Sequence, residues 1–292
     1  QEQAVEGFRQ SLDDLMLTEH LQVMKKDKKT PVKMTETVHK PKLGDKQKKK
    51  LREVENIYHA EKKINGHAIM NKDTYELHKD DGGQIKASND FAGKKMTSVD
   101  DDGKVRNTKE AREYIKSQGL DPDKHQVVEM GQRGASARRD SKYNKVLNAG
   151  DWKENAKAKQ VGQVADKAIK RGEKTIIFYE RKESLPMLQK MFADKYGYKD
   201  GEEMHYIDGS VKFGKHKGSR NDKVTQFNSN PDSRIMFASS AGMTGLNMQK
   251  ANNVIWLSRT TANYLQKQGN ARAMRTGQEK DVNVHYVDTA TI

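Results

Sequence analysis

The second half of the chain alternates short apolar stretches with longer amphipathic ones, and this alternation restricts the fold more than any other feature of the sequence. The apolar stretches predict strands at 174–179, 204–207, 234–238, 253–257 and 282–287. The amphipathic stretches predict helices at 156–171, 183–196, 221–227 and 264–274. Short strands separated by helices are typical of a buried parallel sheet with crossover helices. The predicted fold class is therefore α/β, with helices on both faces of a parallel sheet.

This fold class also predicts where a ligand would bind. In open α/β sheets, ligands lie beyond the carboxyl ends of the strands. The loops in that position are 180–183, 208–220, 239–247 and 258–263.

The first 150 residues have a different composition. Lysine-rich and acidic runs, such as KQKKK at 46–50 and DDDGK at 100–104, predict solvated faces or loops. Short helical patterns occur at 49–63 and 108–118. We therefore expect a mixed, largely helical and loop-rich N-terminal region. The basic segment GQRGASARR at 131–139 has two interpretations, a nucleic-acid loop or a solvated linker, and the linker is favoured.

Charge and composition narrow the classes of partner. The net charge of +14 fits a phosphate backbone or a soluble lysine-rich surface equally well. The absence of cysteine excludes disulfides and thiolate metal sites. No apolar run approaches the roughly 20 residues that span a bilayer, and the first segment is not a signal peptide. The expected location is cytoplasmic, nucleoid-associated or within a virion. Both ends of the sequence are expected to be cuts within a longer polypeptide.

The segment QGNARAMRTGQ carries the strongest functional signal. It resembles motif VI of Swi/Snf-type translocases, which belong to superfamily two of the helicases. The matching positions are Gln268, Arg272, Arg275, Gly277 and Gln278. On a helix, Arg272 and Arg275 would lie on one face, where two guanidinium groups suit a polyanion. The alternative is a basic helix that faces solvent.

The segment SSAGMTGLNM at 239–248 resembles motif V of the same family and follows a predicted strand. The resemblance implies that Gly245 permits a close approach to nucleotide and that Asn247 meets the ribose. The segment is one residue shorter than the usual pattern, which affects the contacts expected of Ser239 and Ser240.

Two blocks upstream complete the set. The segment KTIIFYERKESLPML at 174–188 resembles motif IV. The series Asp208-Gly209-Ser210, Arg220 and Phe227-Asn228 resembles the family's order of these residues, in which the Gly-Ser backbone contacts a phosphate of the tracked strand. An isolated Asp-Gly pair is more often only a turn.

The first half of the chain is similar to the stretch that ends the first lobe in the Swi/Snf family. The matching residues are Pro31, Lys33, Glu36, Leu43 and Gln47, and then either Lys157 or Lys159. We accordingly expect residues 1–55 to end the first lobe or form interlobe helices, residues 56–150 to be a polar insert or linker, and residues 151–292 to form the second RecA-like lobe.

The sequence lacks a phosphate-binding GxxxxGK[ST] loop and an Asp-Glu box, the groups that hold the phosphates and Mg²⁺ in such enzymes. It also lacks paired His and carboxylate spacings of a metal site. The resemblance therefore implies a first RecA-like lobe, upstream or on another chain, that holds ATP and most contacts to Mg²⁺. Arg272 and Arg275 would act as arginine fingers, and Gly245, Asn247 and Gln268 would support the nucleotide. Gly209, Ser210, Ser239 and Ser240 would contact nucleic acid, expected to be double-stranded DNA. This chain alone should not hydrolyse ATP appreciably.

Two alternatives remain open at this stage. The lobe could be a non-catalytic nucleic-acid-binding or structural module of a larger assembly, for example a phage assembly. It could also be the motor part of a restriction or methyltransferase polypeptide, which would differ only in its neighbours.

Overall fold

The computed structural model describes residues 31–99, 105–214, 216–239, 247–259, 263–275 and 277–289. The chain forms two compact units. Residues up to Gly44 join Leu147–Ile292 in one unit, which we call the lobe. Asp45–Val146 form the other, which we call the insert. Among the described helices, none combines the length and the apolar character needed to cross a membrane.

The lobe is built on a six-stranded sheet with the strand order β1-β11-β10-β7-β9-β8. Every neighbouring pair in this sheet is parallel. The strands are β1 (Met34–His39), β7 (Lys174–Tyr179), β8 (Met204–Ile207), β9 (Ile235–Ser239), β10 (Ala251–Trp256) and β11 (Val282–Val287). The predicted parallel sheet is thus confirmed, and three of its strands have the predicted ends.

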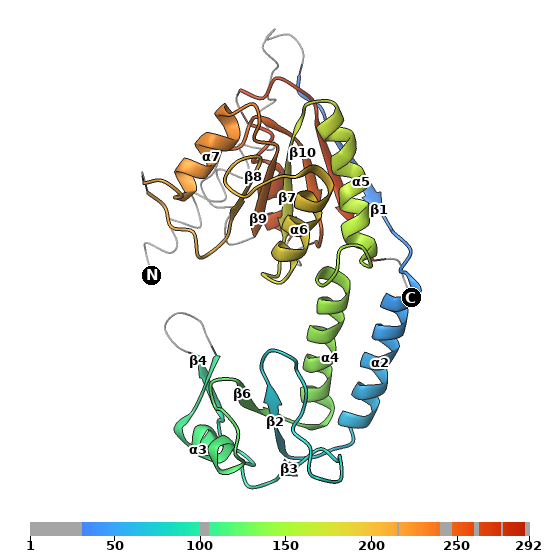
Figure 1. Ribbon diagram of the computed structural model, residues 1–292, viewed down its shortest axis with the longest axis vertical. Coiled ribbons are helices and arrows are strands. Elements are labelled where there is room, and N and C mark those ends of the chain that lie inside the picture. The colour runs from blue at the N-terminus through green and yellow to red at the C-terminus, as the bar shows by residue number, and fades with distance from the viewer. Residues whose placement is uncertain are drawn as a thin grey trace. The chain divides into compact units, whose positions relative to one another are not determined.

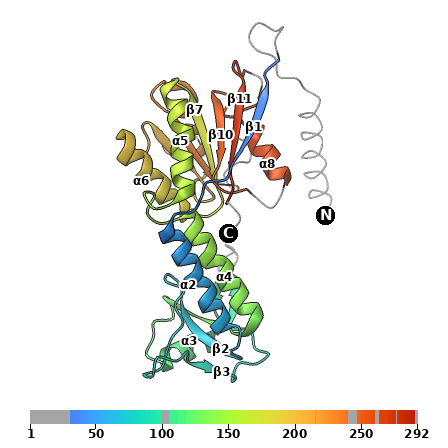
Figure 2. The same ribbon diagram turned by 90° about the vertical axis from the view of Figure 1, so that its right-hand side faces the viewer.

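Four helices of the lobe cover the two faces of this sheet. They are α5 (Ala156–Lys170), α6 (Ser184–Tyr196), α7 (Arg220–Ser229) and α8 (Asn263–Asn270). Figure 2 shows α5 and α6 on one side of the sheet and α8 on the other. Asn155 begins α5 by accepting a hydrogen bond from the Ala158 N–H, and Ser219 caps α7 in the same way through Asp222. The fold class is RecA-like α/β with helices on both faces, as predicted.

The alternation of side chains along the central strands divides the apolar residues into two cores. Ile176 and Phe178 of β7 pack on the α7 and α8 face, with Phe227 and Trp256. Ile177, the residue between them, packs on the α5 and α6 face. Phe178 and Trp256 stack with ring centroids 4.3 Å apart. Both faces of the sheet are therefore buried, which explains the nearly continuous apolar runs of its strands.

Strand β1 is the element whose place differs most from the expectation. Its residues pair with β11 in an unbroken parallel register from Met34↔Val282 to His39↔Val287. Val32, just before it, is buried in the lobe's core. Residues 31–44 therefore belong to this compact unit, and the two units divide at Gly44 and Leu147, whereas the expected divisions were at residues 55 and 150. A short, largely exposed strand has no pattern that reveals a partner more than two hundred residues away.

The insert begins with helix α2 (Asp45–Glu61) and ends with helix α4 (Gly131–Asn148). Between them lie a three-stranded antiparallel sheet, a two-stranded hairpin and helix α3 (Lys109–Ser117) (Figure 1). The sheet has the order β3-β2-β6, with β2 (His67–Asn71), β3 (Ala87–Ser88) and β6 (His125–Glu129). The hairpin pairs β4 (Thr97–Val99) with β5 (Val105–Asn107).

The insert has its own apolar cores in the described residues, so of the two expectations for residues 56–150, a polar insert or a linker, it has the character of an insert. Ile69, Ile115 and Val127 are almost fully buried together between α3 and the three-stranded sheet. The sequence concealed this because the strands are two to five residues long, too short for a clear period-two pattern.

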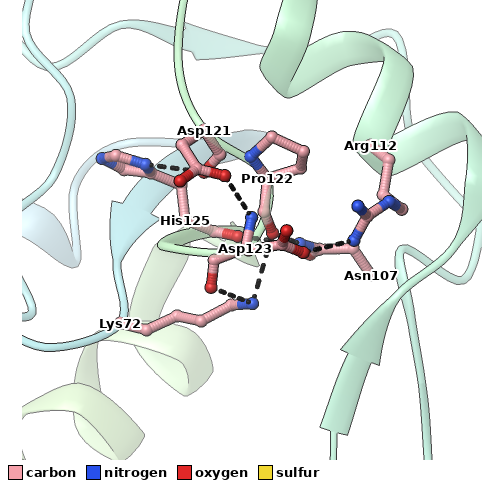
Figure 3. A network of polar contacts seen from close by, with 7 residues as sticks. All are labelled: Lys72, Asn107, Arg112, Asp121, Pro122, Asp123 and His125. Atoms are coloured by element: carbon pink, nitrogen blue, oxygen red, sulfur yellow. Dashed lines mark hydrogen bonds and ion pairs between the residues drawn. The ribbon is translucent and has the colours of Figure 1, made fainter.

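A polar network holds the turn that leads into β6 (Figure 3). Asn107 donates to the carbonyls of Pro122 and His125, at 2.8 and 2.7 Å. Lys72 donates to the carbonyls of Pro122 and Asp123, and Arg112 forms an ion pair of 2.9 Å with the Asp123 carboxylate. These contacts satisfy the carbonyls of a turn that forms no ladder, so we assign the network a structural role.

The GQRGASARR segment is the start of helix α4, so it is neither a loop nor a linker. Arg138 forms a buried ion pair of 2.7 Å with Glu61 at the end of α2, and it also donates to the Glu129 carbonyl at 2.7 Å. Gly134 lies so close to that carbonyl that an added Cβ would be 1.9 Å from its oxygen. The arginine and the glycine therefore fasten α4 to α2 and β6.

One prediction follows from the pair His39 and His285, which joins β1 to β11. Their ring nitrogens are 3.1 Å apart. Burial lowers the pKa of His285 to about 4, helped by the positive charges of His39, Arg171 and Lys167. Burial and Lys167 also lower the pKa of His39. Between about pH 6.5 and pH 4 the unfolded chain therefore binds protons that the folded chain does not, and the free energy of unfolding falls as the pH is lowered.

We expect Tm to fall between pH 7 and pH 5 in the wild type and to fall less in His285→Gln. His59→Gln, at an exposed histidine of the insert, is the control. If Tm has the same pH dependence in all three proteins, the folded state does not resist protonation of His39 and His285.

Candidate nucleotide and nucleic-acid sites

The carboxyl ends of β8 and β9 bring two of the predicted nucleic-acid contacts together. Ile207 is paired with Ala238, so Asp208 and Ser239 each follow one residue later at the same edge. Gly209 and Ser210 are exposed in the loop after β8, whereas Ser239 is buried. The Oγ of Ser239 and the Oη of Tyr179, its register partner on β7, have no hydrogen-bond partner among the described residues. This edge therefore presents an exposed loop beside two unsatisfied hydroxyls.

Asp208 organises that loop. Its Oδ1 accepts hydrogen bonds from the N–H and Oγ of Ser210. Burial acts to raise the pKa of Asp208, but these hydrogen bonds and the charge of Lys182 hold the pKa below its usual range. Arg220 donates from Nη2 to the Asp208 carbonyl at 2.9 Å and from Nε to the Val211 carbonyl. Arg220 is thus a buried brace of the loop, whose exposed residues are Gly209 and Ser210.

The same edge contains a buried lysine. Lys157, rather than the exposed Lys159, is enclosed at the start of α5, and its Nζ donates to Asn148 Oδ1 at 3.0 Å. Ser258, just after β10, donates to the same oxygen at 3.0 Å. Burial lowers the pKa of Lys157 to about 8, against the opposing effect of Asp288 and Glu180. Asn148 therefore links the beginning of α5 to the residues that follow β10.

The residues of motif VI lie at the other end of β10. The Met248 N–H donates to the Arg272 carbonyl at 3.2 Å. The Gln278 side chain is buried and donates to the carbonyls of Ala251 and Ala273, at 2.7 and 3.0 Å. Asn228 donates to the Asn247 carbonyl at 2.9 Å. The structure thus joins the end of motif V to motif VI at the amino end of β10, away from the loop at Asp208.

Arg272 and Arg275 do not lie on one face of a helix, contrary to the expectation. Helix α8 ends at Asn270, and both arginines are in the turns that follow. Arg272 is 4% exposed, whereas Arg275 is exposed. Gly269 and Asn270 are poor helix residues, and the side chain of Asn270 is engaged elsewhere.

Asn270 lies at the centre of a buried hydrogen-bond chain. Trp256 Nε1 donates to its Oδ1 at 2.9 Å, and its Nδ2 donates to Tyr286 Oη at 2.9 Å. Tyr286 in turn donates to Glu36 at 2.7 Å. The chain connects α8 to β10, β11 and β1, and so it fixes where the segment with the arginines leaves the sheet.

The remaining predicted residues are distributed as follows. Gln268 is partly buried within α8, one turn before Arg272. Asn247 is exposed beside Met248. Ser240 and Gly245 lie outside the described residues. Sequence reasoning missed Asn270, Trp256 and Asn148, because buried polar partners of this kind leave no spacing pattern. In the described part of the chain, no group of three or more His, Asp or Glu side chains is arranged to hold a metal ion.

Part of the lobe is similar in sequence to a known protein family. Residues 156–277 match the family described as the helicase conserved C-terminal domain. This part of the chain is similar to that domain. The predicted resemblance to a helicase C-terminal lobe is thereby confirmed. The likeness to solved Swi2/Snf2-type structures concerns the fold.

Individual relatives point the same way. The putative ATP-dependent helicase/translocase YwqA of Bacillus subtilis is 34% identical over 93 residues, which are 32% of this chain and 10% of that protein. The crystal structure of the C-terminal part of the Fun30 ATPase domain has a TM-score of 0.53 at 18% identity, covering 88% of this chain and 86% of that one. The Sulfolobus solfataricus SWI2/SNF2 ATPase core in complex with dsDNA has a TM-score of 0.50 at 16% identity, covering 88% and 41%. The chain spans less than half of that core, and the structural likenesses show the fold.

The first prediction from the site concerns the hydrogen-bond chain. Tyr286→Phe should lower the free energy of unfolding by about 1–2 kcal/mol, because it leaves a buried Asn270 donor without its partner. Tyr264→Phe, at a tyrosine that is 59% exposed, should leave the stability unchanged. Urea unfolding followed by tryptophan fluorescence measures both, and equal stabilities would contradict the assigned role of the chain.

The second prediction separates the two arginines of motif VI. Arg272→Ala should cost about 1–3 kcal/mol, because it removes a buried side chain. Arg275→Ala should change the stability by less than about 0.5 kcal/mol, because its side chain is exposed. Differential scanning calorimetry of the two variants checks this, and a destabilised Arg275→Ala would mean that Arg275 is also structural.

Proposed function

We propose that this chain supplies the second lobe of an ATP-dependent DNA translocase, with Arg272 and Arg275 as arginine fingers. One observation carries the proposal: motif V and motif VI, matched in order by the sequence, are bonded to each other through Met248 and Arg272. Arg275, which is exposed, lies three residues after Arg272 in the chain. Two arginines beside a loop of the kind that contacts nucleotide can stabilise the negative charge that develops on a transferred phosphoryl group.

The two arginines differ in what they would do. Arg275 is exposed, so its guanidinium is free to approach a γ-phosphate presented by a facing lobe. Arg272 is almost fully buried, and it would reach that phosphate only from within the junction with Met248. Asn247, Gly245 and Gln268 would support the nucleotide. ATP and its Mg²⁺ would be held mainly by a first RecA-like lobe, in the same polypeptide or on another chain.

The nucleic acid would bind at the opposite edge of the sheet. The phosphate backbone of one strand would be contacted by Gly209, Ser210, Ser239 and Ser240. Contacts to the phosphate backbone do not distinguish one base sequence from another. The bracing of the Asp208 loop by Arg220 supports this assignment, because a fixed backbone is suited to a repeating phosphate. We propose double-stranded DNA as the substrate. Closing and opening of the cleft between the two lobes would then move this lobe along one DNA strand.

The proposal is tested by DNA-stimulated ATPase activity of a polypeptide that combines this chain with its phosphate-binding lobe. Arg275→Ala should reduce kcat by about 10³-fold or more, the range known for arginine fingers in GTPases, without changing Tm. Arg171→Ala, at an exposed arginine after α5, is the control and should keep full activity. The chain without the first lobe should show no ATPase activity.

Retained activity in Arg275→Ala would overturn its role as a finger. If a folded two-lobe protein shows no stimulated ATPase at all, the motor function is wrong. The lobe would then be a nucleic-acid-binding or structural module.

A further inference from the structure

The first half of helix α2 carries a dense group of cations that the helicase lobe does not use. They are Lys46, Lys48, Lys49, Lys50 and Arg52, all exposed, and we call them the α2 basic cluster. The same stretch contains one acidic residue, Asp45. In the described residues, Lys48, Lys49, Lys50 and Arg52 form no ion pair with a carboxylate.

This arrangement is unfavourable for an isolated helix. The positive end of the helix dipole lies at the N-terminus, where acidic side chains are stabilising and lysines are not. Lys46 and Lys50, and likewise Lys48 and Arg52, are four residues apart, so each pair places like charges one above the other. Two other cations of the insert pair with carboxylates, Arg112 with Asp123 and Arg138 with Glu61. Apart from the acidic Glu53 that follows Arg52, the α2 basic cluster therefore has an electrostatic cost that no ion pair within the described residues offsets for those four cations.

The geometry of α2 directs the cluster away from the insert's core. Gln47, Leu51 and Val54 are buried, and Gln47 donates to the Val146 carbonyl of α4 at 3.0 Å. This leaves the opposite face outward. At 3.6 residues per turn, Lys46 and Lys50 lie on one flank of that face, Lys48 and Arg52 on the other, and Lys49 between them. The cations thus form two rows along the helix.

We propose that the α2 basic cluster binds the phosphate backbone of double-stranded nucleic acid, as a second contact outside the helicase lobe. An α-helix is about 10–12 Å across with its side chains, close to the roughly 12 Å width of a B-DNA major groove. A row of cations on each flank therefore faces the phosphates of both strands at once. Release of counterions from those phosphates offsets the repulsion within the cluster.

This inference concerns a different unit from the arginines of motif VI, and it does not depend on ATP hydrolysis. It shares with the proposed function only the binding of nucleic acid. Lysines and one arginine without aromatic or amide neighbours provide phosphate contacts, so the binding is independent of base sequence.

The test measures the affinity of the full chain for a fluorescently labelled 25-base-pair duplex and for its single strand, by anisotropy over a series of salt concentrations. The test variant replaces Lys48, Lys49, Lys50 and Arg52 with glutamine. The control replaces Lys79, Lys86, Lys94 and Lys95, four exposed lysines outside α2 in the same unit, with glutamine. Both variants lose four positive charges, so a difference between them reports position rather than net charge.

In the cluster variant, the plot of log association constant against log salt concentration should be less steep by about 3–4. Duplex binding at low salt should be weaker by about tenfold or more. Its effect on the duplex should exceed its effect on the single strand, and its Tm should equal or exceed that of the wild type. The control variant should change duplex binding much less. Equal losses in the two variants, or no loss in the cluster variant, would overturn the inference while leaving the proposed function of the lobe standing.

Discussion

The buried hydrogen-bond chain from Trp256 through Asn270 and Tyr286 to Glu36 is the interaction on which the arrangement of the lobe depends. Trp256, Asn270 and Tyr286 are buried, where an unpaired donor or acceptor would be costly, whereas Glu36 at the end of the chain is exposed. Because they satisfy one another, the chain holds β1 to the sheet and ends α8 at a fixed point. The turns with Arg272 and Arg275 begin at that point, so a structural constraint sets the position of the residues proposed to act on ATP.

The lobe keeps two groups of residues apart. The loop from Asp208 to Ser210 lies beyond the carboxyl end of β8, while Met248, Arg272 and Gln278 are bonded together at the amino end of β10. In the sequence, the segment of motif V runs from Ser239 at the first edge to Asn247 at the second. A single short segment therefore connects the place proposed for nucleic acid with the place proposed for nucleotide. Such a connection is what a motor needs if a change at one site is to alter the other.

The insert interrupts the lobe between β1 and α5, and this has a consequence for folding. Strand β1 pairs with β11, and the whole insert and four other strands of the sheet lie between them in the chain. Contacts of such high sequence separation carry a large loop-closure cost and form late. The insert shortens the effective separation, because it folds around its own cores and α4 returns the chain beside α2 through Gln47 and the Arg138–Glu61 ion pair.

The sequence by itself determined the parallel sheet, its central strands and the order of the helicase motifs. Those features rest on local patterns: apolar runs such as 174–179, helix periodicity, and fixed spacings such as Arg272 to Gln278. Only the tertiary structure decided that β1 completes the lobe's sheet, that residues 45–146 form a folded unit, and that Arg272 is buried while Arg275 is exposed. The physical reason is the same in each case. Edge-strand pairing, very short strands and the engagement of Asn270 are set by partners distant in the chain, and such partners leave no periodic trace in the residues themselves.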